Sequence, residues 1–215
     1  LPDTVQEQFN DAIDQGLDGI IVYVDKAGKE SAFYASGWKN RENKVPADPR
    51  ALFKIASINK LYIAVAAAKL VHQQKLSLDD TLAEHFPELV GRIANAEKIT
   101  LRMMVQHRSG IPNLTDTPNF WSDPPESSKE ALELVLDLPA DFEPDKKYRY
   151  SNTNYLLISE LIEKEVGYSK FQYIREEILN PLGLKNTFGS IKEVNADDVM
   201  SGYYVGYDMD LKTDN

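Results

Sequence analysis

The sequence predicts an α+β protein, with a small β element at its start and a mostly helical region after it. Residues 19–24 and 31–35 are β-rich runs on either side of a turn that contains a glycine, which predicts a hairpin. From residue 57 to about residue 180 helical patterns dominate, and prolines break them into short pieces. With 42% hydrophobic and 27% charged residues, a chain of 215 residues can bury a core of ordinary size.

A short amphipathic helix is expected ahead of the hairpin. Val5, Phe9 and Ile13 recur every four residues, and Gly16 follows them as a typical helix stop. One face of this helix should therefore pack inward.

The helical region has identifiable starts. Residues 58–71 form the most apolar segment of the chain and follow Ser57, so we expect a buried helix there. Ser127 precedes a second apolar repeat, and Ser151 precedes a third that ends at Gly167. No linker rich in Gly, Ser or Pro separates two parts, so we expect residues 1–215 to belong to a single domain.

The composition argues against several classes of function. A net charge of −10 and a pI near 4.8 disfavour nucleic acids and anionic membrane surfaces as partners, because such binding relies on clustered Lys and Arg. No run approaches the roughly 20 apolar residues that a membrane span needs. Cysteine is absent, and His72, His85 and His107 have no metal-ligand spacing, so we expect no metal site.

A Ser-x-x-Lys pattern occurs twice, at Ser36 with Lys39 and at Ser57 with Lys60. Ser36 follows a strand and precedes a glycine, so we interpret it as a turn serine. Ser57 stands at the start of an apolar helix, where residues three apart share one face and the amine of Lys60 can reach the hydroxyl. This pair could be a nucleophile with its base, or a plain capping serine beside a solvated lysine.

A second group of polar residues, Tyr150, Ser151 and Asn152, lies just before a predicted helix. In an extended segment residues two apart point the same way, so the phenol of Tyr150 and the amide of Asn152 can face one cleft. A phenol beside an ammonium group ionises more easily and can transfer protons, and an amide side chain suits a substrate amide. The alternative is a half-buried tyrosine with a capping asparagine.

Together these residues resemble the serine β-lactamase and penicillin-binding group, and more narrowly the class C β-lactamases with their DD-peptidase and esterase relatives. Residues 53–60 resemble the first motif of that group, and residues 150–152 resemble its second motif in the Tyr-x-Asn form. Residues 76–80, 99–112 and 181–184 also agree, so the likeness extends over most of the chain.

The resemblance implies a β-lactamase/transpeptidase-like fold and a serine hydrolase that forms an acyl-enzyme. Ser57 would be acylated, Lys60 and Tyr150 would move its proton, and Asn152 would bind a small-molecule or peptide substrate: a D-alanyl peptide, a β-lactam or a small ester. His107 lies in a loop that we interpret as structural. The resemblance also implies an exported protein of the periplasm or outer cell surface, with no cofactor.

The sequence departs from the family at its third motif, a Lys or His followed by Ser or Thr and Gly on a late strand. Residues 212–214 lack the glycine. In relatives that strand supplies an oxyanion donor and completes the sheet, and a sheet without it keeps an open apolar edge. We therefore expect an incomplete domain whose C-terminal strands are missing: a fragment or cleaved half of a longer protein, or the partner of a second polypeptide that carries those strands. Of these we favour a partner segment from the same protein. A non-catalytic module that binds or senses penicillin or peptidoglycan is the alternative function.

Overall fold

The computed structural model describes residues 4–118, 120–205 and 210–212, which form two compact units. The first unit comprises residues 1–56 and 186–215, and the second comprises residues 57–185. Positions 213 and 214, which we compared with the third motif, lie outside the described residues.

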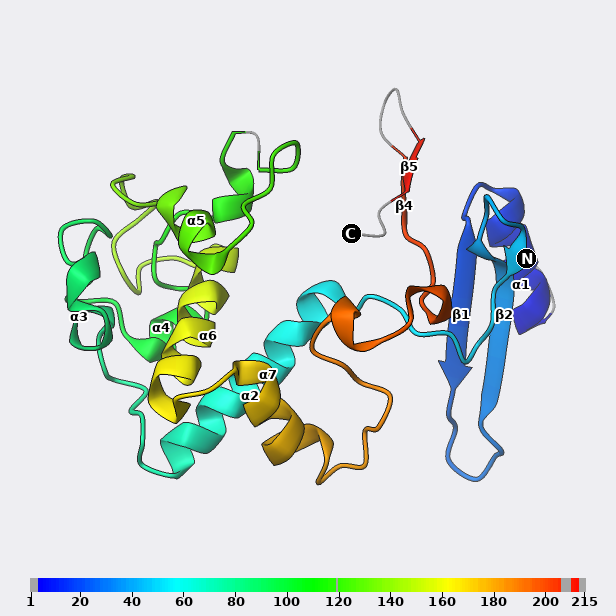
Figure 1. Cartoon of the computed structure of the whole chain (residues 1–215), viewed down its shortest axis with the longest axis horizontal. Helices are drawn as coiled ribbons and strands as arrows, with labels where there is room; N and C mark the ends of the chain where they lie inside the picture. The colour runs from blue at the N-terminus through cyan, green and yellow to red at the C-terminus, as the bar shows by residue number, and fades with distance from the viewer. Residues whose placement is uncertain (1–3, 119, 206–209, 213–215) are drawn as a thin grey trace. The chain divides into compact units, whose positions relative to one another are not determined.

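A helix and a three-stranded antiparallel sheet form the first unit (Figure 1). These elements are α1 (Val5–Asp14), β1 (Gly19–Val24), β2 (Ala32–Asn40) and β3 (Val45–Pro46). Thr4 starts α1 with a capping box, and α1 packs against β2. The order β1-β2-β3 leaves β1 at an edge, paired in the described residues with β2 alone. The predicted helix and hairpin are therefore confirmed.

Later elements of the first unit are short. They are the turns η5 (Ile191–Glu193) and η6 (Ala196–Asp198) and the strand pair β4 (Tyr203–Val205) and β5 (Asp210–Lys212). The backbone N–H of Leu52 donates to Asp198, and that of Met200 donates back to Leu52. These bonds connect the two stretches of chain that make up the unit.

Ser36 lies within β2, where it pairs with Ile20. Its hydroxyl donates to Oδ1 of Asn10 at 2.8 Å. The prediction of a turn serine is therefore wrong: pairing with β1 keeps the chain extended at Ser36, and pairing with β3 continues the strand beyond Gly37 to Asn40.

Short helices dominate the second unit, as predicted (Figure 1). The α-helices are α2 (Asn59–His72), α3 (Leu82–His85), α4 (Leu101–Val105), α5 (Ser128–Glu133), α6 (Asn152–Val166) and α7 (Lys170–Ile174). Single turns are η1 (Ala56–Ile58), η2 (Pro87–Leu89), η3 (Leu114–Asp116) and the π-turn η4 (Arg175–Leu179). Helix α6 packs against α2, α4 and α7 and contributes the fully buried side chains Leu157, Ile158, Leu161 and Ile162 to the core. The predicted α+β class is therefore confirmed.

Helix α2 is buried on one face only. Ala66 and Leu70 are fully buried, whereas the side chains of Leu61 and Val65 are 66% and 46% exposed. The prediction of a buried helix depends on this segment being the most apolar of the chain. It holds for the face that carries Ala66 and Leu70 and is wrong for the face that carries Leu61 and Val65, since an apolar composition does not say which faces of a helix pack against a neighbour.

Both predicted helix starts are confirmed. Ser127 caps α5 by accepting a hydrogen bond from the N–H of Glu130. Ser151 is the N-cap of α6, and Gly167 ends that helix in the left-handed conformation at φ +79°. Within the described residues, no helix combines the length and the apolar character that crossing a membrane would require.

Candidate active site

Ser57 lies in the turn η1 immediately before α2, and its side chain is exposed. The N-cap of α2 is Ile58, which makes no side-chain capping bond. The hydroxyl of Ser57 instead lies 2.8 Å from the phenol oxygen of Tyr150 and 3.1 Å from Nζ of Lys60. This serine therefore does not act as a helix cap, and its oxygen stays accessible while two proton-carrying groups contact it.

Lys60 lies on the first turn of α2, three residues after Ser57, so both side chains are on one face of the helix. Its amine donates to Oγ of Ser57 and, at 2.8 Å, to Oδ1 of Asn152. It also lies over two aromatic rings, 5.1 Å from the centre of Tyr150 and 5.8 Å from that of Tyr155. The amine is therefore held among polar and aromatic partners and is not a solvated surface group.

The phenol of Tyr150 has an environment that favours its ionised form. Burial alone would raise its pKa, but the neighbouring amine of Lys60 and the hydrogen bond with Ser57 outweigh that effect. The pKa of Tyr150 is therefore lowered from its ordinary value. Oδ1 of Asn152 lies 3.4 Å from the phenol oxygen, a long contact beside the 2.8 Å contact with Ser57.

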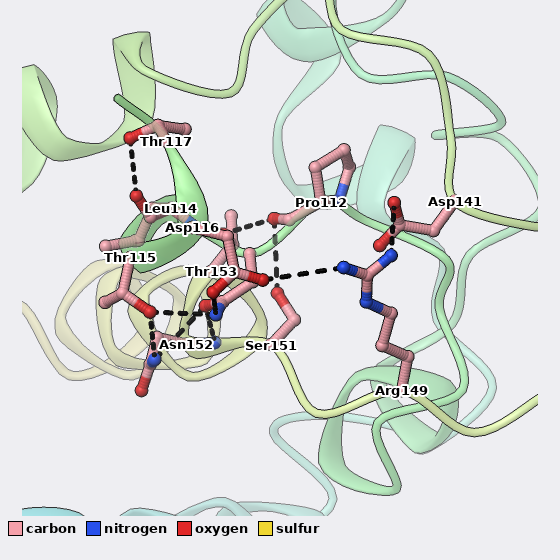
Figure 2. Close-up of polar contacts among 11 residues, drawn as sticks. Pro112, Leu114, Thr115, Asp116, Thr117, Asp141, Arg149, Ser151, Asn152 and Thr153 are labelled. Carbon is pink, nitrogen blue, oxygen red and sulfur yellow. Dashed lines mark hydrogen bonds and ion pairs between the residues drawn. The ribbon is translucent and has the colours of Figure 1, made fainter. Parts of the chain in front are cut away.

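The loop after α4 holds the segment that carries Tyr150 and Asn152 (Figure 2). The carbonyl of Pro112 accepts hydrogen bonds from the hydroxyls of Ser151, at 3.2 Å, and Thr153, at 2.7 Å. The backbone N–H of Leu114 donates in turn to the Thr153 hydroxyl at 3.0 Å. The start of α6 is thus fixed to a loop about 40 residues earlier in the chain.

Asn113 and Thr115 set the orientation of the Asn152 amide. Oδ1 of Asn113 accepts from the backbone N–H of Asn152 at 2.9 Å and from its Nδ2 at 3.1 Å. Thr115 Oγ1 also accepts from Nδ2 of Asn152 at 3.1 Å (Figure 2). Because both contacts engage the donor end of the amide, its oxygen is turned toward Lys60.

Sequence reasoning did not find Asn113 and Thr115. The sequence does carry a signal for a turn here. Residues 113–116 follow a proline and include Asn, Thr and Asp, whose side chains often form hydrogen bonds with nearby backbone. Asn113 does donate to Thr115 and to Asp116, each at 2.8 Å. Nothing in the sequence, however, indicated that this turn would face Asn152.

Arg149 stands next to Tyr150 in the sequence, but its charge is engaged elsewhere. The guanidinium forms ion pairs with Asp141 at 3.0 Å and with Asp116 at 3.5 Å (Figure 2). Lys60 is therefore the cation that acts on the phenol. Among the residues that the structure describes, no group of three or more His, Asp or Glu could hold a metal ion.

This chain belongs to the beta-lactamase family, because residues 4–212 match the model described as Beta-lactamase. The geometry just described falls inside that match. Among curated proteins, the chain is 26% identical over 201 residues to Protein flp of Staphylococcus aureus, covering 91% of this chain and 40% of that protein.

Two solved structures are also similar. D-amino acid amidase from Ochrobactrum anthropi SV3, complexed with L-phenylalanine amide, is 30% identical with a TM-score of 0.81, over 92% of this chain and 56% of that one. The octameric penicillin-binding protein homologue from Pyrococcus abyssi is 28% identical with a TM-score of 0.82, over 97% and 50%. The chain thus spans roughly half the length of the proteins it matches.

Proposed function

We propose that this chain carries the nucleophile and proton-transfer groups of a serine hydrolase that cleaves an amide or ester through an acyl-enzyme. The observation that carries the proposal is the position of the Ser57 hydroxyl, which contacts the phenol of Tyr150 and the amine of Lys60 at the same time. A nucleophile with a base in hydrogen-bond reach and a third group that orients the base is the general pattern of covalent catalysis.

The contacts suggest the direction of the first proton transfer. Lys60 donates a hydrogen bond to Oγ of Ser57, which leaves the serine hydrogen free to point at the phenol oxygen of Tyr150. Tyr150 in its phenolate form takes this proton as Oγ attacks the substrate carbonyl carbon. The carbonyl electron pair moves to its oxygen, so a tetrahedral oxyanion forms.

The same groups serve the remaining steps. When the oxyanion collapses, the bond to the leaving amine or alkoxide breaks, and that group takes the proton from Tyr150. Water then attacks the acyl-serine and gives its proton to Tyr150, and Oγ of Ser57 regains a proton when the acid product leaves. Asn152 is proposed to hold the substrate and to keep the Lys60 amine in place through its side-chain oxygen.

The substrate class is proposed from the chemistry and from the neighbours. A D-alanyl peptide, a β-lactam and a small ester all present a carbonyl carbon to the same nucleophile. Family membership and the similarity to a D-amino acid amidase support amides of D-amino acids as the first substrates to test.

The test uses the protein expressed from its complete gene, incubated with a fluorescent penicillin, a chromogenic ester and D-alanine and D-phenylalanine amides. Intact mass and product formation are read for wild type, Ser57→Ala and Ser36→Ala. Ser36 is a matched control because it belongs to the other Ser-x-x-Lys pattern, and its hydroxyl bonds to Asn10.

We expect an adduct or turnover in wild type and in Ser36→Ala, and none in Ser57→Ala. Loss of the nucleophile should lower kcat by at least about a thousandfold. Turnover that survives in Ser57→Ala would contradict the proposal. Reversible binding of penicillin without any adduct or turnover in wild type would favour the non-catalytic binding module instead.

A further inference from the structure

His107 packs against Tyr150 from the loop that follows α4. Its side chain is only 8% exposed. The imidazole centre lies 4.5 Å from the centre of the Tyr150 ring and 5.2 Å from that of Tyr155, with interplanar angles of 31° and 34°. The imidazole therefore supports one side of the phenol ring, whose hydroxyl reaches Ser57.

The same residue binds the backbone on both sides of Tyr150. Its carbonyl oxygen accepts from the N–H of Arg149 at 3.0 Å, and its Nδ1 accepts from the N–H of Ser151 at 3.1 Å. One histidine thus fixes the residue before and the residue after the phenol. An alanine would retain the first of these bonds and lose the second.

The backbone of His107 is itself in an uncommon conformation. Its φ is +56°, in the left-handed region that only a few per cent of non-glycine residues adopt, with Asn, Asp and His enriched among them. Such a conformation persists only where the surroundings fix it, and it is found disproportionately at functional sites. The two bonds and the ring contacts help to fix it here, together with the bond from its own N–H to the carbonyl of Met104 at 3.1 Å and a 3.4 Å contact between Nδ1 and Nδ2 of Asn154.

We propose that His107 is the positioning residue for Tyr150: in its neutral form, with the proton on Nε2, it holds the phenol against Ser57, and protonation of the ring releases it. This inference rests on the proposed function, because it assigns a role within the same site. The bond from Ser151 requires a lone pair on Nδ1, so it exists only while that nitrogen carries no proton.

The surroundings keep the ring neutral at ordinary pH. The ionisable groups that face it are the amine of Lys60 on α2, the phenols of Tyr148 and Tyr150, and Tyr155 on α6. Burial lowers the pKa of His107, and the charge of Lys60 lowers it further. The hydrogen bond from the Ser151 N–H to Nδ1 of His107, which we call the clamp, is therefore intact at neutral pH. It is lost as the pH falls through the lowered pKa of His107, below 6.5.

Three variants separate positioning from simple packing. His107→Ala removes the Nδ1 acceptor, the ring and the titration. His107→Asn removes the ring and the titration but keeps an acceptor, since its Oδ1 lies close to the Nδ1 position, and asparagine tolerates positive φ. His72→Asn is the control, because His72 is exposed at the far end of α2 from Ser57.

The measurements are kcat and KM from pH 4.5 to 9 in the complete gene product, with the folded fraction of each variant determined by circular dichroism. We expect His107→Ala to lower kcat roughly tenfold, the equivalent of one lost hydrogen bond, with little change in KM. His107→Asn should recover most of that loss. Wild type and His72→Asn should show an extra steepening of the acid limb below pH 6.5 that neither His107 variant shows.

Nitrogen-15 NMR of histidine-labelled wild type tests the clamp without any assay of activity. At neutral pH the Nδ1 resonance of His107 should be that of an unprotonated acceptor, and Nε2 should carry the hydrogen. A proton on Nδ1 at neutral pH would overturn the inference, as would an unchanged kcat in folded His107→Ala. If Ser57→Ala retained turnover, the proposed function would fail, and this spectrum would still decide whether the clamp exists.

Discussion

The hydroxyl of Ser57 and the phenol of Tyr150 lie 2.8 Å apart, although 93 residues separate them in the chain. Each is placed by a different structure: Ser57 by the turn before α2, and Tyr150 by the loop that binds the start of α6. Lys60 connects the two segments, because its amine donates hydrogen bonds both to Ser57 and to Asn152. The geometry of the site therefore depends on how α2, α6 and this loop pack together.

Replacing Tyr150 with Phe should remove proton transfer while the ring packing remains. Phe lacks the hydroxyl that contacts Ser57 but keeps the ring that stacks on His107. General acid–base groups contribute about a hundredfold to ten-thousandfold, so the acylation rate should fall within that range. The check is the rate of adduct formation by mass spectrometry, with thermal unfolding as the control for folding. A variant that acylates at the wild-type rate would exclude Tyr150 as the base.

The lowered pKa of Tyr150 gives a second prediction. If the phenolate is the base, the acylation rate rises with pH until the pH exceeds the pKa of Tyr150, and then levels off. Because that pKa is lowered from its ordinary value near 10, the midpoint of the rise should lie below pH 10. A pH–rate profile of wild type and Tyr150→Phe tests this: the rising limb should be present in the first and absent from the second.

Asn113 and Thr115 provide a graded pair of variants. Asn113→Ala removes the acceptor of the Asn152 backbone N–H and one hydrogen bond of the Asn152 side-chain amide. Thr115→Val leaves the backbone bond intact and removes one hydrogen bond of the same amide and one bond to Asn113. An unsatisfied buried group costs about 1–3 kcal/mol. Asn113→Ala should therefore lose more stability in urea unfolding than Thr115→Val.

Asn113→Ala and Thr115→Val should also lower the catalytic activity. We expect each to lower kcat/KM, roughly tenfold for Thr115→Val and more for Asn113→Ala, since the oxygen of Asn152 is then less firmly aimed at Lys60. Asn43→Ala serves as a surface asparagine control, because Asn43 is exposed and belongs to the first unit, outside the loop that holds Asn152. Equal activity in Asn113→Ala and wild type would show that the amide is oriented by other means.

The sequence predicts those elements whose signals are local. Val5, Phe9 and Ile13 predict α1, and Ser151 with Gly167 predicts both ends of α6, because capping and periodicity depend on neighbouring residues. Long-range relations are harder to predict. No local signal says that Asn113 will bind Asn152, since 39 residues separate them and the contact depends on tertiary packing.

The two wrong predictions have the same cause. The glycine after Ser36 predicts a turn, but pairing with β1 keeps the chain extended through this position. The composition of the helix after Ser57 predicts burial, but Leu61 and Val65 are exposed. In both cases the residue types are compatible with two environments, and the environment is chosen by segments distant in sequence.

We expect that only glycine is tolerated at position 110, where the loop that supports the site lies against the backbone of Phe142. Its φ is +79°, and a Cβ there would lie 2.1 Å from the carbonyl oxygen of Phe142. The N–H of Asp141 also donates to the Gly110 carbonyl at 2.9 Å, so the two stretches of backbone cannot separate without losing that bond. Gly110→Ala therefore combines an unfavourable backbone conformation with a clash against main chain, which has little freedom to move.

Gly91→Ala isolates the conformational part of this cost. Gly91 has nearly the same φ, +80°, but a Cβ there would meet no atom within 4 Å. We expect Gly91→Ala to lose about 1 kcal/mol of unfolding free energy, and Gly110→Ala to lose at least about 2 kcal/mol more. The measurement is urea unfolding of both variants beside wild type. If the two losses were equal, the clash with Phe142 would be relieved without cost, and glycine would be needed at position 110 only for its positive φ.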